Sequence, residues 1–145
     1  MIEKLQQVLH SEIPLTKAIG IEVIEYNENS LTISAPLENN INHKCTAFGG
    51  SLYSVSVLSG WGLIYLLLEK FNLTGHIVIQ ESHTKFIKPV DSDITSSCTF
   101  ESPAHYEKFI NMYRKKGKAR IKLESKVICN GEICVIFTGH YVVHK

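Results

Sequence analysis

The residues with the clearest chemical potential lie between Asn42 and Ser51, where a polar loop leads into a long uncharged segment. Gly49 and Gly50 stand at the expected start of a helix, and the first N–H groups of a helix have no partner within it. Because glycine has no side chain to cover them, these N–H groups and that of Ser51 are open to a ligand. They can polarise a carbonyl oxygen and stabilise the oxyanion that forms when water attacks. Asn42 is a further candidate for holding the carbonyl or the water.

Chemistry at that carbonyl also needs a group that activates water, and two side chains are candidates. His43 adjoins Asn42, and histidine changes its charge near neutral pH. Glu81 lies on an otherwise apolar expected strand, where a carboxylate is costly unless it is paired or functional. The alternatives are that His43 caps a loop and that Glu81 faces outward and pairs with Lys85.

Other side chains near the loop are weaker candidates. Ser51 and Ser54 can orient water, although serines on buried helices commonly bond the preceding turn. Cys45 is close to His43 in sequence, but no acid is visible to orient the pair, so a nucleophilic thiol is disfavoured. It is also an alternative that the two glycines only allow close packing and that the asparagine caps a turn. No metal site is expected, because four histidines show no recognisable ligand spacing: His76, His83, His140 and His144.

Size and composition describe one domain over residues 1–145 with an ordinary core. Hydrophobic residues make up 44% of the chain and charged residues 20%, so folding needs no metal or disulfide. The net charge of +1 gives no indication of a nucleic-acid partner. Four scattered cysteines without a CxxC pattern, and an N-terminus without a secretory leader, predict reduced thiols and a cytoplasmic location.

One uncharged stretch, from Cys45 to Leu68, is long enough to suggest a membrane span. Its serines and glycines dilute the hydrophobicity, and the strands that follow need an apolar element to cover them. We therefore expect a buried helix over residues 48–71, roughly 36 Å long, and no membrane partner.

The remaining pattern is that of an α+β fold. Apolar residues at helical spacing cover residues 2–13, and this helix ends at Pro14. Residues 102–117 are expected to form a linker with room for a short helix. Strands are predicted for six segments that alternate or are rich in β-branched residues: 19–26, 31–37, 76–87, 91–101, 118–129 and 132–144.

The last two strands pose a problem of register. Asn130–Gly131 is a strong hairpin signal, but a strict two-residue turn pairs the charged Lys126 with the apolar Val135. Either a β-bulge shifts the register, or the outer face of the sheet is partly covered, for example by a second subunit.

The run Thr46-Ala47-Phe48-Gly49-Gly50-Ser51-Leu52, followed by Gly60-Trp61-Gly62, resembles the C-terminal thioesterase-like domain of bacterial YiiD proteins. More distantly, its loop-to-helix entry is similar to that of hotdog thioesterases of the phenylacetyl-CoA type. The resemblance covers nearly the whole chain in element order. It implies a hotdog fold, with an antiparallel sheet wrapped around one long central helix. It also implies hydrolysis of an acyl-CoA or acyl carrier protein thioester, with no further cofactor.

The candidate site residues divide into two groups. Catalysis is expected from Asn42, His43, Gly50 and Glu81, and substrate binding from Thr46, Phe48, Gly49, Ser51 and Ser54. A hotdog fold also implies a homodimer or a dimer of dimers, and in such a dimer Glu81 is a candidate to act across the subunit interface.

Two positions depart from the phenylacetyl-CoA pattern. Phe48 stands where that type has a histidine, and Val57 where it has a catalytic aspartate. The alternative function is therefore a non-catalytic acyl-thioester or acyl-carrier binding module, while a hotdog dehydratase, which needs an acid–histidine pair, is disfavoured. The basic run 114–118 is expected to be a solvated turn, and the alternative is that it binds the phosphates of coenzyme A or an acidic carrier protein.

Overall fold

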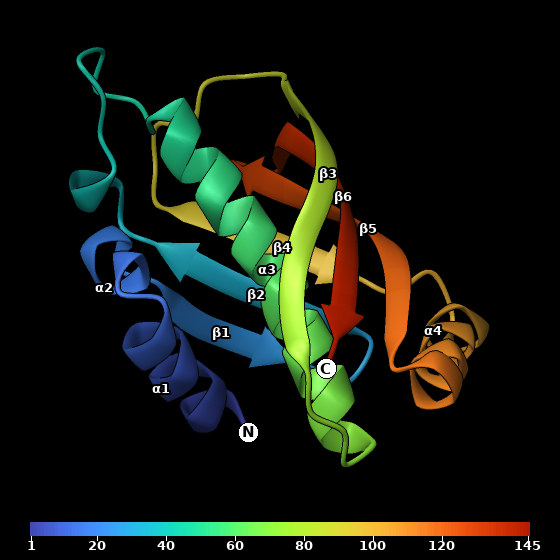
Figure 1. Cartoon of the computed structure of the whole chain (residues 1–145). Helices are drawn as coiled ribbons and strands as arrows, with labels where there is room; N and C mark the ends of the chain where they lie inside the picture. Colours follow the sequence, from blue (N-terminus) through green and yellow to red (C-terminus); the bar gives the residue numbers. More distant parts are fainter.

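The computed structural model describes residues 1–145 and has one antiparallel sheet curled around a long helix (Figure 1). The strands follow one another across the sheet in the order β1-β2-β4-β5-β6-β3. Their bounds are β1 Glu22–Tyr26, β2 Ser30–Ala35, β3 His76–Phe86, β4 Ile94–Thr99, β5 Lys118–Cys129 and β6 Glu132–His144. The helices are α1 Ile2–Glu12, α2 Leu15–Ile19, α3 Gly49–Lys70 and α4 Pro103–Lys116, with a 3-10 turn, η1, at Leu37–Asn39.

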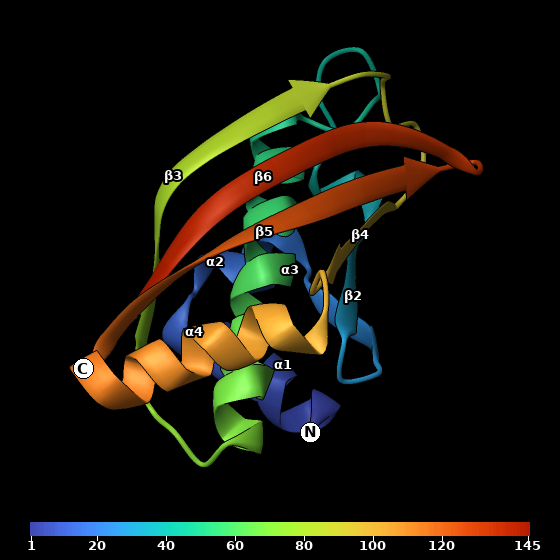
Figure 2. The same cartoon turned by 90° about the vertical axis from the view of Figure 1, so that its right-hand side faces the viewer.

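The helix α3 is the centre of the core. The curled sheet passes over it along most of its length (Figure 2). By length and composition α3 could cross a membrane, with a mean hydropathy of 1.6, yet 67% of that apolar window is buried inside the protein. This agrees with the predicted buried helix, and a sheet wrapped around one long helix is the predicted hotdog fold.

The middle of α3 approaches the sheet closely because small residues face it. Gly60 lies against Tyr141 of β6, whose hydroxyl donates to the helix backbone at 2.8 Å. Next to it, Ser59 Oγ lies 3.0 Å from Ser96 Oγ of β4 and 2.8 Å from Ser125 Oγ of β5. The three serines are buried and satisfy one another, so these polar groups are compensated inside the core.

The N-terminal segment differs in part from the prediction. The helix α1 confirms the predicted helix over residues 2–13. The predicted strand from Ile19 is wrong in its first residues, because Ile19 ends α2 and β1 begins only at Glu22. Gly20 stops α2 in the left-handed conformation, with φ 81°. A helix of five residues shows no periodicity in the sequence, so the sequence does not predict α2.

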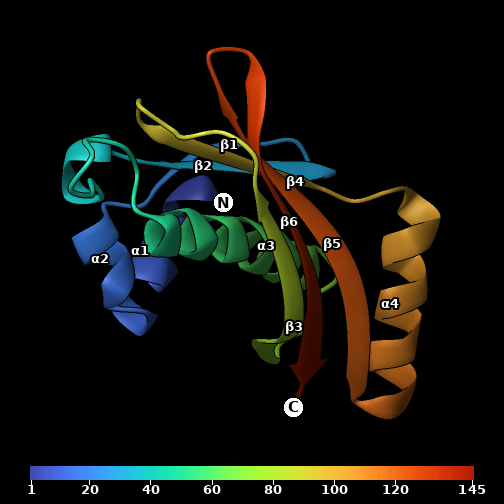
Figure 3. The same cartoon turned by 90° about the horizontal axis from the view of Figure 1, so that it is seen from above.

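The segment predicted as a linker is almost entirely helix. Ser102 accepts a hydrogen bond from the N–H of His105, Pro103 opens α4, and Gly117 follows it at φ 70°. These are common start and stop signals of a helix. In Figure 3, α4 lies on one side of α3 and α1 and α2 lie on the other. The preceding strand, β4, begins at Ile94, later than predicted.

A β-bulge resolves the register of β5 and β6. After the turn, Ile128 pairs with Ile133 but Val127 pairs with Val135, so Cys134 is the extra residue. Beyond the bulge, the inward side chains of β5 meet the inward side chains of β6. The first of the two predicted alternatives is therefore confirmed, and no cover over the outer face is needed to explain the pattern.

The strand β3 forms one edge of the sheet and carries a second bulge, at Gln80. Beyond it, Thr84 faces α3, because it pairs with Phe137, which is fully buried in the core. Ser82 and Phe86 share that inner face, since side chains alternate along a strand. This second bulge decides which residues of β3 reach the start of the central helix.

Candidate functional site

The loop before α3 is anchored by Asn40, a residue that the sequence did not single out. Its side chain is buried, and its Nδ2 donates to the carbonyl oxygens of Ile19 at 2.9 Å and Pro36 at 2.8 Å. Its own carbonyl accepts the N–H of Phe48 at 2.7 Å. The N–H of Ala47 donates to a carbonyl just before β4 at 2.8 Å. These bonds fix the start of α3 to α2 and to the segment between β3 and β4.

Asn42 and Thr46, two predicted site residues, are brought together in the turn that follows. Asn42 Oδ1 accepts the N–H groups of Lys44 at 2.8 Å and Thr46 at 3.1 Å, and Asn42 Nδ2 lies 3.0 Å from the Thr46 hydroxyl. This is the turn-capping role that was the alternative to carbonyl binding. A side-chain amide has two N–H donors, so Asn42 keeps one for a ligand.

Gly49 and Gly50 begin α3, and their N–H groups make no hydrogen bond within the chain. The N–H of Ser51, predicted as a third donor, is already used by the carbonyl of Phe48 at 3.0 Å. Ser54 Oγ donates to the carbonyl of Gly50 at 2.9 Å, which is the bond to the preceding turn. The helix therefore presents two open donors at its start.

Two exposed aromatic rings border these donors. Phe48 is 57% exposed and Phe86, at the end of β3, is 56% exposed. A Cβ built on Gly50 would lie 2.5 Å from the Phe48 ring, and one built on Gly49 would lie 3.9 Å from the Phe86 ring. Apolar walls beside open N–H groups lower the local dielectric and so strengthen hydrogen bonds to a charged oxygen.

A pair of hydroxyl groups that no sequence pattern indicates lies beside the helix start. Tyr53, in the second turn of α3, has its hydroxyl 3.1 Å from Ser82 Oγ on the inner face of β3. The Tyr53 ring packs edge-on against Phe137 at 5.6 Å between centroids. Ser82 faces inward because of the bulge at Gln80, and nothing in the sequence marks that bulge.

The two predicted water-activating residues lie in different parts of the fold, His43 in the loop before α3 and Glu81 on the sheet. His43 is exposed in the turn that Asn42 caps, a few residues before the helix start. Glu81 pairs with His140, and both alternate with residues that face the core, so Glu81 lies on the outer face, turned away from α3. Within one chain the structure does not bring Glu81 to Gly49 and Gly50.

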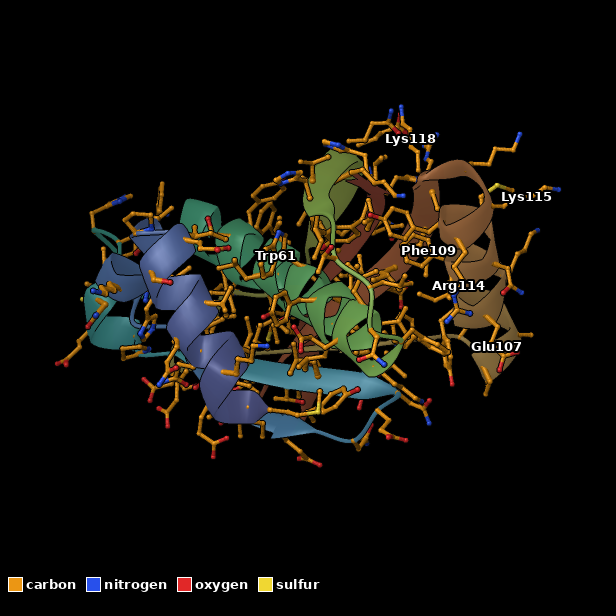
Figure 4. All side chains as sticks on the ribbon, turned by 60° about the horizontal axis from the view of Figure 1, so that its bottom comes forward. Trp61, Glu107, Phe109, Arg114, Lys115 and Lys118 are labelled. Carbon is orange, nitrogen blue, oxygen red and sulfur yellow. The ribbon has the colours of Figure 1, made fainter.

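The basic run 114–118 lies beyond the opposite end of α3. Arg114 stacks over the ring of Phe71, the residue after α3, at 5.3 Å. Figure 4 shows Lys115 and Lys118 near the C-terminal end of α4, well apart from Trp61 on α3. At about 1.5 Å per residue, the 22-residue helix separates this run from the two glycines by about 33 Å. Within one chain, the run does not adjoin the open N–H groups.

Comparisons with known proteins agree with this architecture. A family model described as "Putative thioesterase (yiiD_Cterm)" matches residues 2–145. The structure of a protein of unknown function from Chlorobaculum tepidum is 34% identical, has a TM-score of 0.95, and aligns over 99% of this chain and 93% of that one. A "putative thioesterase" from Shewanella oneidensis is 32% identical, with a TM-score of 0.87 and coverage of 99% and 97%. A thioesterase from Haemophilus influenzae, 15% identical, shares the fold with a TM-score of 0.76 and coverage of 99% and 90%.

Proposed function

Because the chain belongs to the family described as "Putative thioesterase (yiiD_Cterm)", we propose that it hydrolyses an acyl thioester at the start of α3. The acyl group is carried by coenzyme A or by an acyl carrier protein. One observation carries the proposal: the open N–H groups of Gly49 and Gly50, which the buried Asn40 holds in place. The family supports a thioester hydrolase, while the substrate and the residue roles are proposed from the geometry.

In the proposed reaction, the thioester oxygen accepts hydrogen bonds from the N–H groups of Gly49 and Gly50. Water attacks the carbonyl carbon, and the negative charge on the oxygen is stabilised by these donors and by the positive end of the helix. The carbon–sulfur bond then breaks, the carboxylic acid leaves, and the thiolate takes up the proton that the water lost. Loss of one such donor typically lowers the rate by about a hundredfold to a thousandfold, so two donors account for a large part of the catalysis.

For activation of the water, we propose His43 in preference to Glu81. His43 belongs to the turn that leads into α3, whereas Glu81 faces the other side of the sheet. The hydroxyls of Tyr53 and Ser82, already within hydrogen-bond distance of each other, can orient the water from the side of β3.

We further propose that the functional unit is a homodimer formed through β3. This edge strand has 11 residues and a free row of N–H and C=O groups, which favours pairing with another strand. Its side chains include the exposed Val78, at 44%, and Phe86. Antiparallel pairing of two copies of β3 would bring the far end of the partner's α3 toward Gly49 and Gly50. The partner's basic run would then have a route to the phosphates of coenzyme A. A monomeric mass in solution would contradict this proposal.

A second candidate function is a non-catalytic acyl-thioester binding module. The observation that favours it is the composition of α3, which has no carboxylate before Glu69. Glu69 itself is paired with Lys4 of α1 at 3.0 Å, at the far end of the helix from the open donors. A binding module would keep the donors and need no base.

Thiol release from a panel of acyl-CoAs and acyl carrier proteins tests the proposal. We expect wild type to release thiol, His43→Ala to lose most of the activity, and Glu81→Ala to keep it. Lys44→Ala, an exposed change in the same turn, is the matched control. If wild type binds acyl-CoA but releases no thiol above background, the hydrolase proposal fails and the binding module stands. If Asn42→Ala keeps full activity, Asn42 does not hold the carbonyl or the water.

A further inference from the structure

An apolar groove of about 240 Å³ runs along α3, between the α1–α2 junction and β3. Two of its lining residues are polar, and both already use their hydroxyls. Thr16 donates to the carbonyl of Leu9 at 2.9 Å, and Ser54 to that of Gly50 at 2.9 Å. The rest of the wall is hydrocarbon or aromatic, including Ile13, Leu15, Tyr53, Val57, Trp61 and Ile79. The groove therefore offers a ligand apolar surface and almost no free polar group.

The groove begins one helical turn beyond the open N–H groups, on the same face of α3. Gly50, Ser54, Val57 and Trp61 follow one another at the three- and four-residue spacing that places side chains on one face of a helix. Gly50 lies at one end of this face, and Trp61 lies further along it. A ligand whose carbonyl binds at Gly50 can lay its tail over Ser54 and Val57 toward Trp61.

Trp61 is fixed in position by two contacts. Its Nε1 donates to the carbonyl of Ile77 on β3 at 3.1 Å. Its ring stacks on that of Tyr65 in the next turn, with centroids 5.7 Å apart and planes at 8°. Because Trp61 is hydrogen-bonded to β3 and stacked on a second ring, its side chain closes the end of the groove in a fixed position.

The length of the helix face that lines the groove sets the size of the tail. From Gly50 to Trp61 the helix rises by about 16 Å at about 1.5 Å per residue, and contact with the ring takes about 4 Å of this. An extended chain advances about 1.2 Å per bond, which leaves room for about ten bonds.

We infer that this groove binds the acyl chain of the substrate, a straight chain of about eight to ten carbons, and that Trp61 sets its upper length. The inference rests on the proposed function, because it takes the carbonyl to bind at Gly49 and Gly50. Burial of each further methylene strengthens binding by about fourfold. We expect this gain to continue until the chain meets the Trp61 ring and then to stop or reverse.

Binding of alkyl-CoA thioethers tests the inference separately from hydrolysis, because a thioether cannot be hydrolysed. Trp61 is the only tryptophan in the chain, so its fluorescence reports occupation of the groove directly. In a series from butyl to hexadecyl thioethers, the affinity should rise about fourfold per carbon and break near the octyl to decyl members. The emission of Trp61 should shift most for the chains at the break.

Two variants move the break in opposite directions. Trp61→Ala should move it to longer chains, measured by calorimetry because the fluorophore is lost. Val57→Phe, which narrows the groove before its end, should move the break to shorter chains. This variant tests the inference even if Trp61→Ala does not fold. Met112→Ala removes an exposed apolar side chain on α4 and is the matched control, with no change expected.

The outcomes separate the inference from the proposed function. If thioethers show the break but thioesters are not hydrolysed, the hydrolase proposal fails and the chain-length inference stands. If thioesters are hydrolysed with no break in the series, or if neither variant moves the break, the inference is overturned. If the variants change only the oligomeric state and no thioether binds, the groove is covered by a second copy of the chain, which also overturns it.

Discussion

The start and the buried middle of α3 show how the same residue type serves two purposes. Gly49 and Gly50 at the start of α3 leave backbone N–H groups open, and a Cβ on Gly50 would meet only the exposed ring of Phe48. Gly60 and Gly62, in the buried middle, have no such freedom. A Cβ on Gly60 would overlap Tyr141, and one on Gly62 would lie 2.7 Å from Leu31.

This difference is one of surroundings and not of local sequence. Both pairs are glycines on one apolar helix, so both are consistent with close packing and with open backbone. What distinguishes them is the side chain that approaches from another strand or loop, which only the fold reveals. The middle pair lets the sheet touch the helix, and the first pair leaves donors free for a ligand. Substitutions at the two places should therefore fail in different ways.

The largest effect is expected for Gly60→Ala, which should lower the free energy of unfolding by about 3 kcal/mol. The added methyl group displaces the Tyr141 ring and breaks the hydrogen bond from its hydroxyl to the carbonyl of Val57. Chemical denaturation measures this directly. Adding Tyr141→Phe to Gly60→Ala should recover part of the loss, because it removes the overlapping oxygen. Additive losses in the double variant would contradict a contact between the two residues.

The sequence predicted most of the fold because its elements are long and strongly patterned. The uncharged run of α3 and the Asn130–Gly131 hairpin located the central helix and the last two strands. The short helix α2 was missed because five residues show no periodicity. The bulge at Gln80 was also missed, since one extra residue leaves no compositional mark, and with it the inward position of Ser82.

The candidate site was predicted less completely, for a physical reason. Gly49 and Gly50 could be recognised because the N-terminus of a helix has open donors whatever the tertiary contacts are. Among several asparagines before α3, by contrast, only burial distinguishes the anchor. Asn40 donates to the carbonyl of Ile19, which is distant in sequence, and to that of Pro36, which is close in sequence. Asn42 caps a local turn. No sequence pattern separates these two roles.

The two asparagines in the loop before α3 should also differ in their effect on stability. Asn40→Ala should lower the free energy of unfolding by about 2 kcal/mol, because two buried carbonyls lose their donor. Asn42→Ala removes a half-buried side chain that caps a turn, and it should lower the free energy of unfolding by about 1 kcal/mol or less. Thermal and denaturant unfolding of the two variants measure the difference. Equal losses would mean that Asn40 is not the anchor of the helix start.

Gly50→Ala tests the open end of the comparison, with an effect on activity and not on stability. Its methyl group pushes the Phe48 ring across the donors, so kcat/KM for acyl thioesters should fall by about tenfold, which corresponds to about 1.4 kcal/mol. The free energy of unfolding should change by less than about 1 kcal/mol, because alanine is favoured in a helix. Adding Phe48→Ala should make room for the methyl group and restore part of the activity. Full activity in Gly50→Ala alone would show that these donors do not face the substrate.

The smallest expected effect comes from a titrating group in the buried middle of the molecule. Burial raises the pKa of the Cys98 thiol, on β4 under α3, to about 12, from 9.0 for an ordinary thiol. The buried neutral thiol therefore contributes stability that is fully present below about pH 9 and is lost as the pH rises toward 12. Between about pH 9 and 10, wild type should lose about 1 kcal/mol more than Cys98→Ser, whose hydroxyl does not titrate there. Denaturant unfolding at several alkaline pH values measures the two slopes. Cys45→Ser, which removes an exposed thiol before α3, is the control and should keep the wild-type slope; equal slopes for all three proteins would mean that Cys98 is accessible to water.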